Sequence, residues 1–179
     1  MKKRMHTLKA GLAVSLAALV LAGCASQAYV QQPPVQFERG VLLQRVDSVM
    51  AIAQNSGSVR LTASPDPVIT GQALQIEIAT TQPGHFYMYQ VATDGRTLSL
   101  VFPNAMDGAN YLAAGTHRLP RANWQLTARG PAGTGYLMGV LTPQPLNVVA
   151  MQADAQQGAI NLPATYSAAL ATLREVVGQ

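Results

Sequence analysis

A short stretch in the middle of the chain restricts the fold more than any other feature. Asp94-Gly95 separates two runs rich in β-forming residues, HFYMYQVAT and RTLSLVFP. Asp-Gly between such runs is the strongest local signal of a β-hairpin, because glycine readily adopts the positive φ that tight turns require. The two runs are therefore predicted to pair antiparallel. The first run carries bulky residues on both of its faces, so its strand is expected to lie in the centre of a sheet.

Alternating apolar and polar residues predict further strands on both sides of this hairpin. Period-two segments lie at residues 59–63, 74–78, 124–128 and 136–141, and turns rich in Gly, Pro and Asn separate them. Short strands at spacings of about 10 to 15 residues are typical of antiparallel sandwiches. The sequence therefore predicts a mainly β fold, an Ig-like or related sandwich of about seven strands over residues 58–145.

Two helices are predicted outside the sandwich. Residues 41–57 form an amphipathic helix with its stop signal, because apolar residues recur on one arc from Leu42 to Ala53 and Asn55-Ser56-Gly57 follows. Its apolar face packs on the domain or docks on a partner or a membrane surface. In the C-terminal segment, 146–179, residues 146–159 fit a short helix or a loop. From Pro163 onward, Tyr166, Leu170 and Leu173 recur with helical period and predict a C-terminal helix.

The N-terminus reads as an export signal that ends in a cysteine. A basic start and an apolar run too short to span a bilayer precede Leu21-Ala22-Gly23-Cys24. This tetrapeptide resembles the bacterial lipobox. The resemblance implies cleavage between Gly23 and Cys24, and attachment of an N-acyl chain and an S-diacylglycerol to Cys24. The alternative is an ordinary secretory signal peptide, 1–23, with a chance cysteine. The Gln- and Pro-rich residues 24–40 are expected to act as a flexible tether.

Charge and cysteine content limit the possible partners. Four of the twelve basic residues lie in the signal, which leaves eight arginines against eight acids in the remainder. A basic footprint for nucleic acid is therefore absent. Cys24 is the only cysteine, so no intramolecular disulfide is expected. Ala25-Ser26 lacks the aspartate that retains lipoproteins in the inner membrane, and this family-level rule favours the outer membrane.

Residues 86–145 carry a resemblance to a known family. The features are the Asp94-Gly95 turn, the strand end Leu100-Val101-Phe102-Pro103-Asn104, Ala114-Gly115 with Leu119-Pro120, and the turn Gly130-Pro131-Ala132-Gly133. Together they resemble DUF4384, a domain of unknown function found in bacterial envelope and signalling proteins. The resemblance implies a β-rich module of envelope assemblies. It brings no catalytic residues to transfer.

The residues offer little for catalysis or metal binding. His85 and His117 are expected to be exposed at strand ends, and neither belongs to a catalytic or zinc-binding motif. Asn104, Asp107 and Asn110 suggest a calcium site only loosely, because the ligand spacing and a closing glutamate are missing. We therefore expect no enzyme activity, no metal and no cofactor.

Aromatic residues provide an alternative to a purely structural reading. Tyr87, Tyr89, Trp124 and Tyr136, with Tyr111, either fill the sandwich core or form an exposed stacking platform for a ligand. The leading hypothesis is a non-enzymatic outer-membrane lipoprotein whose periplasmic part assembles with envelope proteins. The second is a module that binds peptidoglycan or another glycan through these aromatics. The third is a small hydrolase that uses His85 or His117.

Overall fold

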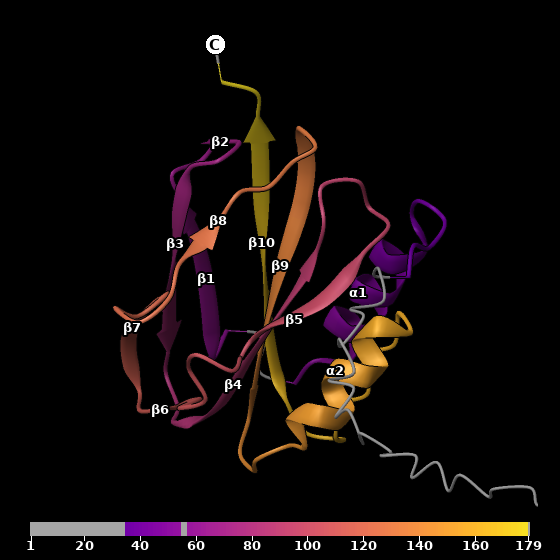
Figure 1. Ribbon diagram of the computed structural model, residues 1–179. Helices are drawn as coiled ribbons and strands as arrows, with labels where there is room; N and C mark the ends of the chain where they lie inside the picture. Colours follow the sequence, from indigo (N-terminus) through magenta and orange to yellow (C-terminus); the bar gives the residue numbers. More distant parts are fainter. Residues whose placement is uncertain (1–34, 55–56, 179) are drawn as a thin grey trace, which may run out of the picture. The chain divides into compact units, whose positions relative to one another are not determined.

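Two β-sheets packed face to face, with helices on one side, make up the part of the chain that the computed structural model describes (Figure 1). That part comprises residues 35–54 and 57–178. The lipobox and most of the predicted tether, residues 1–34, lie outside it. Among the described residues, no helix is long and apolar enough to cross a membrane.

The small sheet has the strand order β1-β3-β7, and β8 also pairs with β3. Its pairs are antiparallel, with Leu61 opposite Ile78 between β1 and β3. Leu74, Ile76 and Ile78 alternate with exposed polar residues along β3, as the period-two pattern predicts. The strands are β1 (Val59–Ser64), β3 (Ala73–Thr80), β7 (Gly115–Leu119) and β8 (Leu126–Thr127).

The large sheet has the order β2-β10-β9-β4-β5, with β6 beside β4. Only β2 pairs in parallel, at the end of β10. The strand β4 lies between β9 and β5 and is buried on both faces, which confirms its predicted central position. The strands are β2 (Val68–Ile69), β4 (Gly84–Val91), β5 (Leu98–Phe102), β6 (Tyr111–Leu112), β9 (Gly133–Thr142) and β10 (Ser167–Val176).

The predicted hairpin is confirmed, with a longer turn than expected. The ladder of β4 and β5 ends at the pair Val91 and Leu98. Gly95 has a φ of 70°, and its N–H donates to the carbonyl of Ala92 at 2.8 Å. The Asp94 carboxylate accepts the N–H of Arg96 at 2.8 Å. Glycine therefore supplies the positive φ, as predicted, while the aspartate side chain closes a turn of more than two residues.

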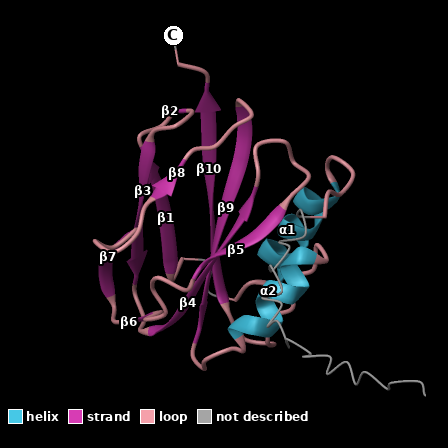
Figure 2. Cartoon of the chain, viewed as in Figure 1, coloured by secondary structure: helices cyan, strands magenta, loops and turns pink. Residues whose placement is uncertain are grey.

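The large sheet has a separate hydrophobic core on each face. Between the sheets, Ile76 and Ile78 of the small sheet meet Phe86 and Leu137 of the large one. On the other face, α1 (Val41–Ile52) and α2 (Val148–Gln156) cover Tyr87 and other side chains of the sheet (Figure 2). The fold is thus a mainly β, antiparallel-rich sandwich with a helical layer on one side.

The helix α1 confirms the amphipathic pattern read in residues 41–54. Leu42 and Val46 are buried against the large sheet, so this face packs on the domain.

The helix α2 resolves the ambiguity in residues 146–159. Asn147 caps it by accepting the N–H of Ala150 at 3.1 Å.

The helix predicted from Pro163 onward is wrong, because these residues form β10. Ala168-Ala169-Leu170-Ala171 is apolar at every position, so helical and strand periods both fit. From Leu170 onward, exposed and buried residues alternate strictly. The strand pairs with β9 from Ser167 opposite Leu141 to Glu175 opposite Gly133. Pairing with β9 therefore makes this segment a strand, although its sequence also fits the helical period.

The predicted domain boundary at residue 145 also needs correction. The C-terminal strand β10 lies inside the large sheet, between β9 and β2. It contributes Ala171 and Leu173 to the core between the sheets. The sandwich therefore extends from β1 to β10, well beyond residue 145. The strand expected at 124–128 is reduced to the two residues of β8.

Candidate interaction site

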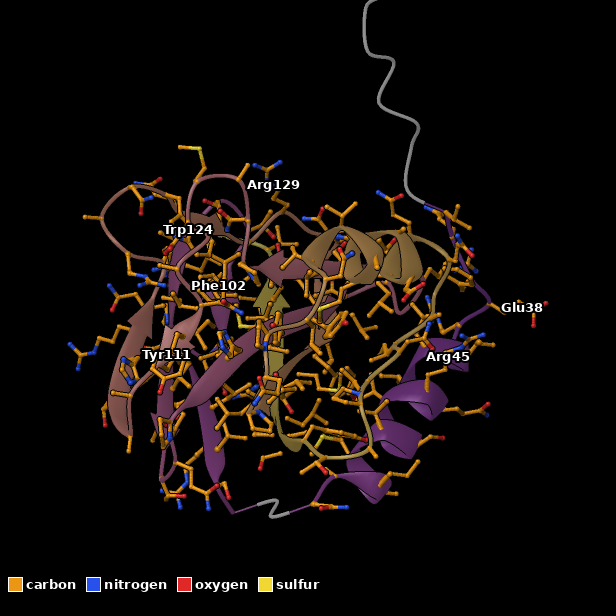
Figure 3. All side chains as sticks on the ribbon, turned by 90° about the horizontal axis from the view of Figure 1, so that it is seen from below. Glu38, Arg45, Phe102, Tyr111, Trp124 and Arg129 are labelled. Atoms are coloured by element: carbon orange, nitrogen blue, oxygen red, sulfur yellow. The ribbon has the colours of Figure 1, made fainter. Side chains whose placement is uncertain are left out.

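The predicted aromatic platform does not form. Tyr87 and Tyr89 are each 1% exposed and lie in the core beneath the helices. Tyr136 is half-buried on that same face of the large sheet. Trp124 packs on the opposite core and stacks on Phe102, with ring centroids 6.4 Å apart (Figure 3). The large sheet therefore separates Trp124 from the tyrosines, and an exposed surface shared by these four residues is ruled out.

The buried tyrosines differ in their hydrogen bonding. The Tyr87 hydroxyl accepts the N–H of Leu146 at 2.7 Å, which ties β4 to the start of the helical segment. The Tyr89 hydroxyl has no hydrogen-bond partner among the residues that the structure describes. Burial raises the pKa of Tyr89 above its ordinary value, and the charges of Asp154 and then Tyr87 add to the rise. Tyr89 is therefore neutral and costs desolvation energy without a compensating bond.

Tyr89→Phe is expected to leave the free energy of unfolding unchanged or raise it by up to about 1 kcal/mol at neutral pH, because it removes an unpaired buried hydroxyl. An unfolded tyrosine ionises near pH 10, whereas folded Tyr89 stays protonated. Below about pH 10 the tyrosine is neutral in both states, so its ionisation leaves the free energy of unfolding unchanged. As pH rises further, ionisation in the unfolded state lowers the free energy of unfolding. Urea unfolding at neutral and alkaline pH measures this effect. The free energy of unfolding should fall less at alkaline pH for Tyr89→Phe than for Tyr111→Phe, which changes an exposed tyrosine. A destabilised variant at neutral pH would show that the hydroxyl has a partner.

The residues considered for calcium instead hold two loops together. The Asn104 side-chain oxygen accepts the N–H groups of Met106 and Asp107. The Asp107 carboxylate accepts Arg121 Nε at 2.7 Å and Trp124 Nε1 at 3.2 Å. The amide of Asn110 donates to the Phe86 carbonyl. The side-chain oxygen of Asn104 and one carboxylate oxygen of Asp107 are therefore engaged by protein donors. The described residues contain no group of three or more His, Cys, Asp or Glu side chains that could hold a metal ion.

Asp107→Ala is expected to destabilise the protein by about 1–3 kcal/mol, because Arg121 and the Trp124 indole N–H both lose their acceptor. The sole tryptophan makes its fluorescence a direct readout of this loop pair. We expect a red-shifted emission maximum together with the lower unfolding midpoint. Arg118→Ala is the control, since its exposed ion pair with Glu77 contributes less than about 1 kcal/mol. Equal effects of the two variants would contradict the role of Asp107.

Both histidines are half-buried rather than fully exposed, and their rings bond to amide groups. His85 Nδ1 lies 3.5 Å from the Asn110 side-chain oxygen, and its ring meets Tyr111 edge-on at 5.3 Å. His117 Nε2 lies 2.8 Å from the Ala113 carbonyl. Within the described ranges, neither ring is hydrogen-bonded to a carboxylate or a hydroxyl. In the described part of the chain, neither histidine therefore contacts a nucleophile of the kind that covalent catalysis uses.

A groove runs between α1 and residues 159–166, with a volume of about 730 Å³. One wall is the edge of α1 beside the face that enters the core, and Val49 belongs to both. Its lining residues follow helical spacing, at Val41, Gln44, Arg45, Ser48, Val49 and Ile52. The side chain of Ile52 is 66% exposed. The helix therefore has a second apolar edge that the domain leaves open.

The other wall is the segment between α2 and β10. It is lined by residues 159–164 and Tyr166, including Ile160 and Leu162. Tyr166 joins the two walls, because its hydroxyl donates to the carbonyl of Val49 at 2.7 Å. The backbone N–H of Gln54 donates to the Tyr166 carbonyl at 2.9 Å. These bonds attach the end of α1 to the start of β10 and hold the groove open.

The sequence indicated the helix but not this groove. The apolar arc, expected to pack on the domain or dock on a partner, packs on the domain through Leu42 and Val46. The groove is lined instead by Gln44, Arg45 and Ser48 of the polar arc. The second wall was hidden in a segment that was ambiguous or predicted helical. The signal was Pro163, which removes a backbone donor and, with Asn161, disfavours a regular helix. The groove exists only because β10 returns the chain to the side of α1.

Comparison with protein families finds a match for part of the chain. Residues 68–145 match DUF4384, a domain of unknown function. This confirms the resemblance seen from Phe86 onward and extends it back to Val68. No curated protein matches the chain, and no solved structure does. The matched segment runs from β2 through β9, so both walls of the groove lie outside it.

Proposed function

We propose that this chain is an outer-membrane lipoprotein whose globular part acts in the periplasm as a non-enzymatic assembly module of an envelope complex. The anchor is supported by the lipobox at Leu21–Cys24, and outer-membrane sorting by Ala25-Ser26. The DUF4384 match is consistent with a β-rich envelope module. In this proposal the lipid holds the domain at the membrane, and one surface of the domain binds a protein partner.

The groove between α1 and residues 159–166 carries the proposal. Its long shape follows a helix, and its lining is apolar except for Gln44, Arg45, Ser48 and Asn161. A lining that combines apolar side chains with several polar groups is typical of sites that bind peptide segments. Catalysis has no comparable support, because the ring nitrogens of His85 and His117 contact amide groups.

A glycan-binding role is the weaker candidate. It rests on Tyr111, which is 59% exposed and held edge-on by His85. A single exposed ring provides less stacking area than the platform that the sequence suggested. Co-sedimentation with purified peptidoglycan, repeated with Tyr111→Ala, tests this alternative directly.

The test of the proposed function is photocrosslinking in intact envelopes. A photoreactive residue at Gln44 lies in the groove, whereas one at exposed Thr116 on β7 lies on the small sheet and is the matched control. We expect Gln44 to give a reproducible adduct with one identified envelope protein, lost in an Ile52→Asp background. Thr116 should give none with that protein. Adducts that are absent at Gln44, or equal at both positions, would contradict the proposal.

A further inference from the structure

We infer that the groove between α1 and residues 159–166 binds an extended peptide segment in which an acidic side chain stands among apolar ones. The inference rests on the proposed function and specifies the chemistry of the partner. Three properties of the groove support it: its charge, the backbone of its second wall, and its length.

Charge is the first property. Arg45 is the only charged side chain among the lining residues, and no acidic residue lines the groove. Arg45 forms no ion pair within the described ranges, where the arginines that do are Arg118, Arg121 and Arg174. Figure 3 places Arg45 near the start of α1 and shows Glu38 pointing away from it. A carboxylate supplied by the partner would complement this guanidinium, and its planar fork suits bidentate pairing.

The backbone of the second wall is the second property. Ile160, Asn161 and Leu162 lie in a segment without regular secondary structure. No hydrogen bond inside the described part of the molecule engages their backbone N–H or C=O groups. Unpaired backbone groups beside an apolar groove are the donors and acceptors that an extended peptide pairs with. A helical ligand would satisfy its own backbone and leave these groups unused.

Length is the third property. From Val41 to Ile52 the lining face of α1 extends about 16 Å at the helical rise per residue. An extended peptide covers that distance with about five residues. Alternate side chains of such a peptide point to one side, so two or three of them would enter the apolar floor near Val49 and Leu162.

The chain's own preceding segment fits poorly as the occupant. Residues 24–34, ASQAYVQQPP after Cys24, contain no aspartate or glutamate. They therefore cannot supply the carboxylate for Arg45. A second copy of the chain remains an outcome that the experiment separates from a peptide of another protein.

The experiment pans a display library of random heptapeptides against the lipidated full-length protein in detergent. We expect enrichment of Asp or Glu flanked by apolar residues. Arg45→Glu should shift the selection to Lys or Arg, whereas Arg60→Glu, an exposed change on β1, should leave it unaltered. A selected acidic peptide should bind about threefold more weakly to Arg45→Gln and about tenfold more weakly to Arg45→Glu.

Three results of the panning would overturn the inference. The first is that no peptide is enriched, and the second is that peptides are enriched without a preference for Asp or Glu. The third is that the wild type and Arg45→Glu select the same peptides. Light scattering that shows a dimer abolished by Ile52→Asp would assign the groove to a second copy instead. If Gln44 still crosslinks to one envelope protein while the acidic preference is absent, only this inference fails. If the crosslink itself is absent, the proposed function fails.

Discussion

A chain that ends at Pro145 is expected to be unfolded, although it contains the whole segment that matches DUF4384. Its loss of residues 146–179 removes β10, which pairs with β9 along most of its length. It also removes Leu173 from the core between the sheets and Ala168 from the core beneath the helices. One buried leucine alone is worth about 2–5 kcal/mol, against a total stability of about 5–15 kcal/mol for a domain of ordinary size.

Circular dichroism and thermal unfolding of residues 35–145 and 35–179 test this expectation. The longer chain should show a cooperative transition and the shorter one none. A finer comparison within β10 uses Leu173→Ala and Leu170→Ala, whose side chains are 2% and 38% exposed. The first should cost about 2–5 kcal/mol and the second less than about 1 kcal/mol. A cooperative transition in residues 35–145 would show that β10 is dispensable.

Cys24→Ser is expected to remove the lipid anchor and to keep the protein from reaching the outer membrane. The thiol is the only one in the chain, so no other residue can take the diacylglycerol. Each buried methylene of an acyl chain contributes about 0.8 kcal/mol to membrane binding, so loss of all acyl chains weakens attachment by many orders of magnitude. The variant should accumulate as uncleaved precursor and incorporate no labelled palmitate, whereas Ser26→Ala should behave like the wild type.

Sorting between membranes needs its own variant. Ala25→Asp keeps Cys24 and therefore the lipid, but introduces the aspartate whose absence favours the outer membrane. On a density gradient it is expected to move from outer-membrane to inner-membrane fractions. Outer-membrane recovery of Ala25→Asp would remove the support for sorting while leaving lipidation intact. Recovery of Cys24→Ser as cleaved protein in outer-membrane fractions, or incorporation of labelled palmitate by this variant, would contradict the lipoprotein assignment itself.

The candidate groove shows how far sequence reasoning reaches. The helix of its first wall was predictable, because Leu42 and Val46 recur at the helical period. That the edge with Arg45 and Ile52 lines a groove was not predicted. The second wall was not predictable either. Whether Ile160 and Leu162 line a groove depends on where the following strand takes the chain, and the run of alanines in that strand hides its period.

The aromatic residues make the same point for the sheet. Period two correctly places Tyr87 and Tyr89 on one face of β4. The pattern does not show which layer covers that face, because both faces of a strand buried on two sides carry apolar residues. The helices cover the tyrosines, and the small sheet covers Phe86 and Met88.

The sequence by itself determined two features that depend on near neighbours: the hairpin at Asp94-Gly95 and the amphipathic helix after residue 40. Such features depend on backbone preferences and on the spacing of nearby residues, which are the same whatever tertiary contacts the segment makes. The signal around Cys24 lies outside the described residues and stays a prediction. Only the tertiary structure decided that Ser167–Val176 is a strand, that the sandwich includes it, and that α1 has an open edge facing residues 159–166. Those outcomes depend on burial against residues far away in the chain, which local pattern does not encode.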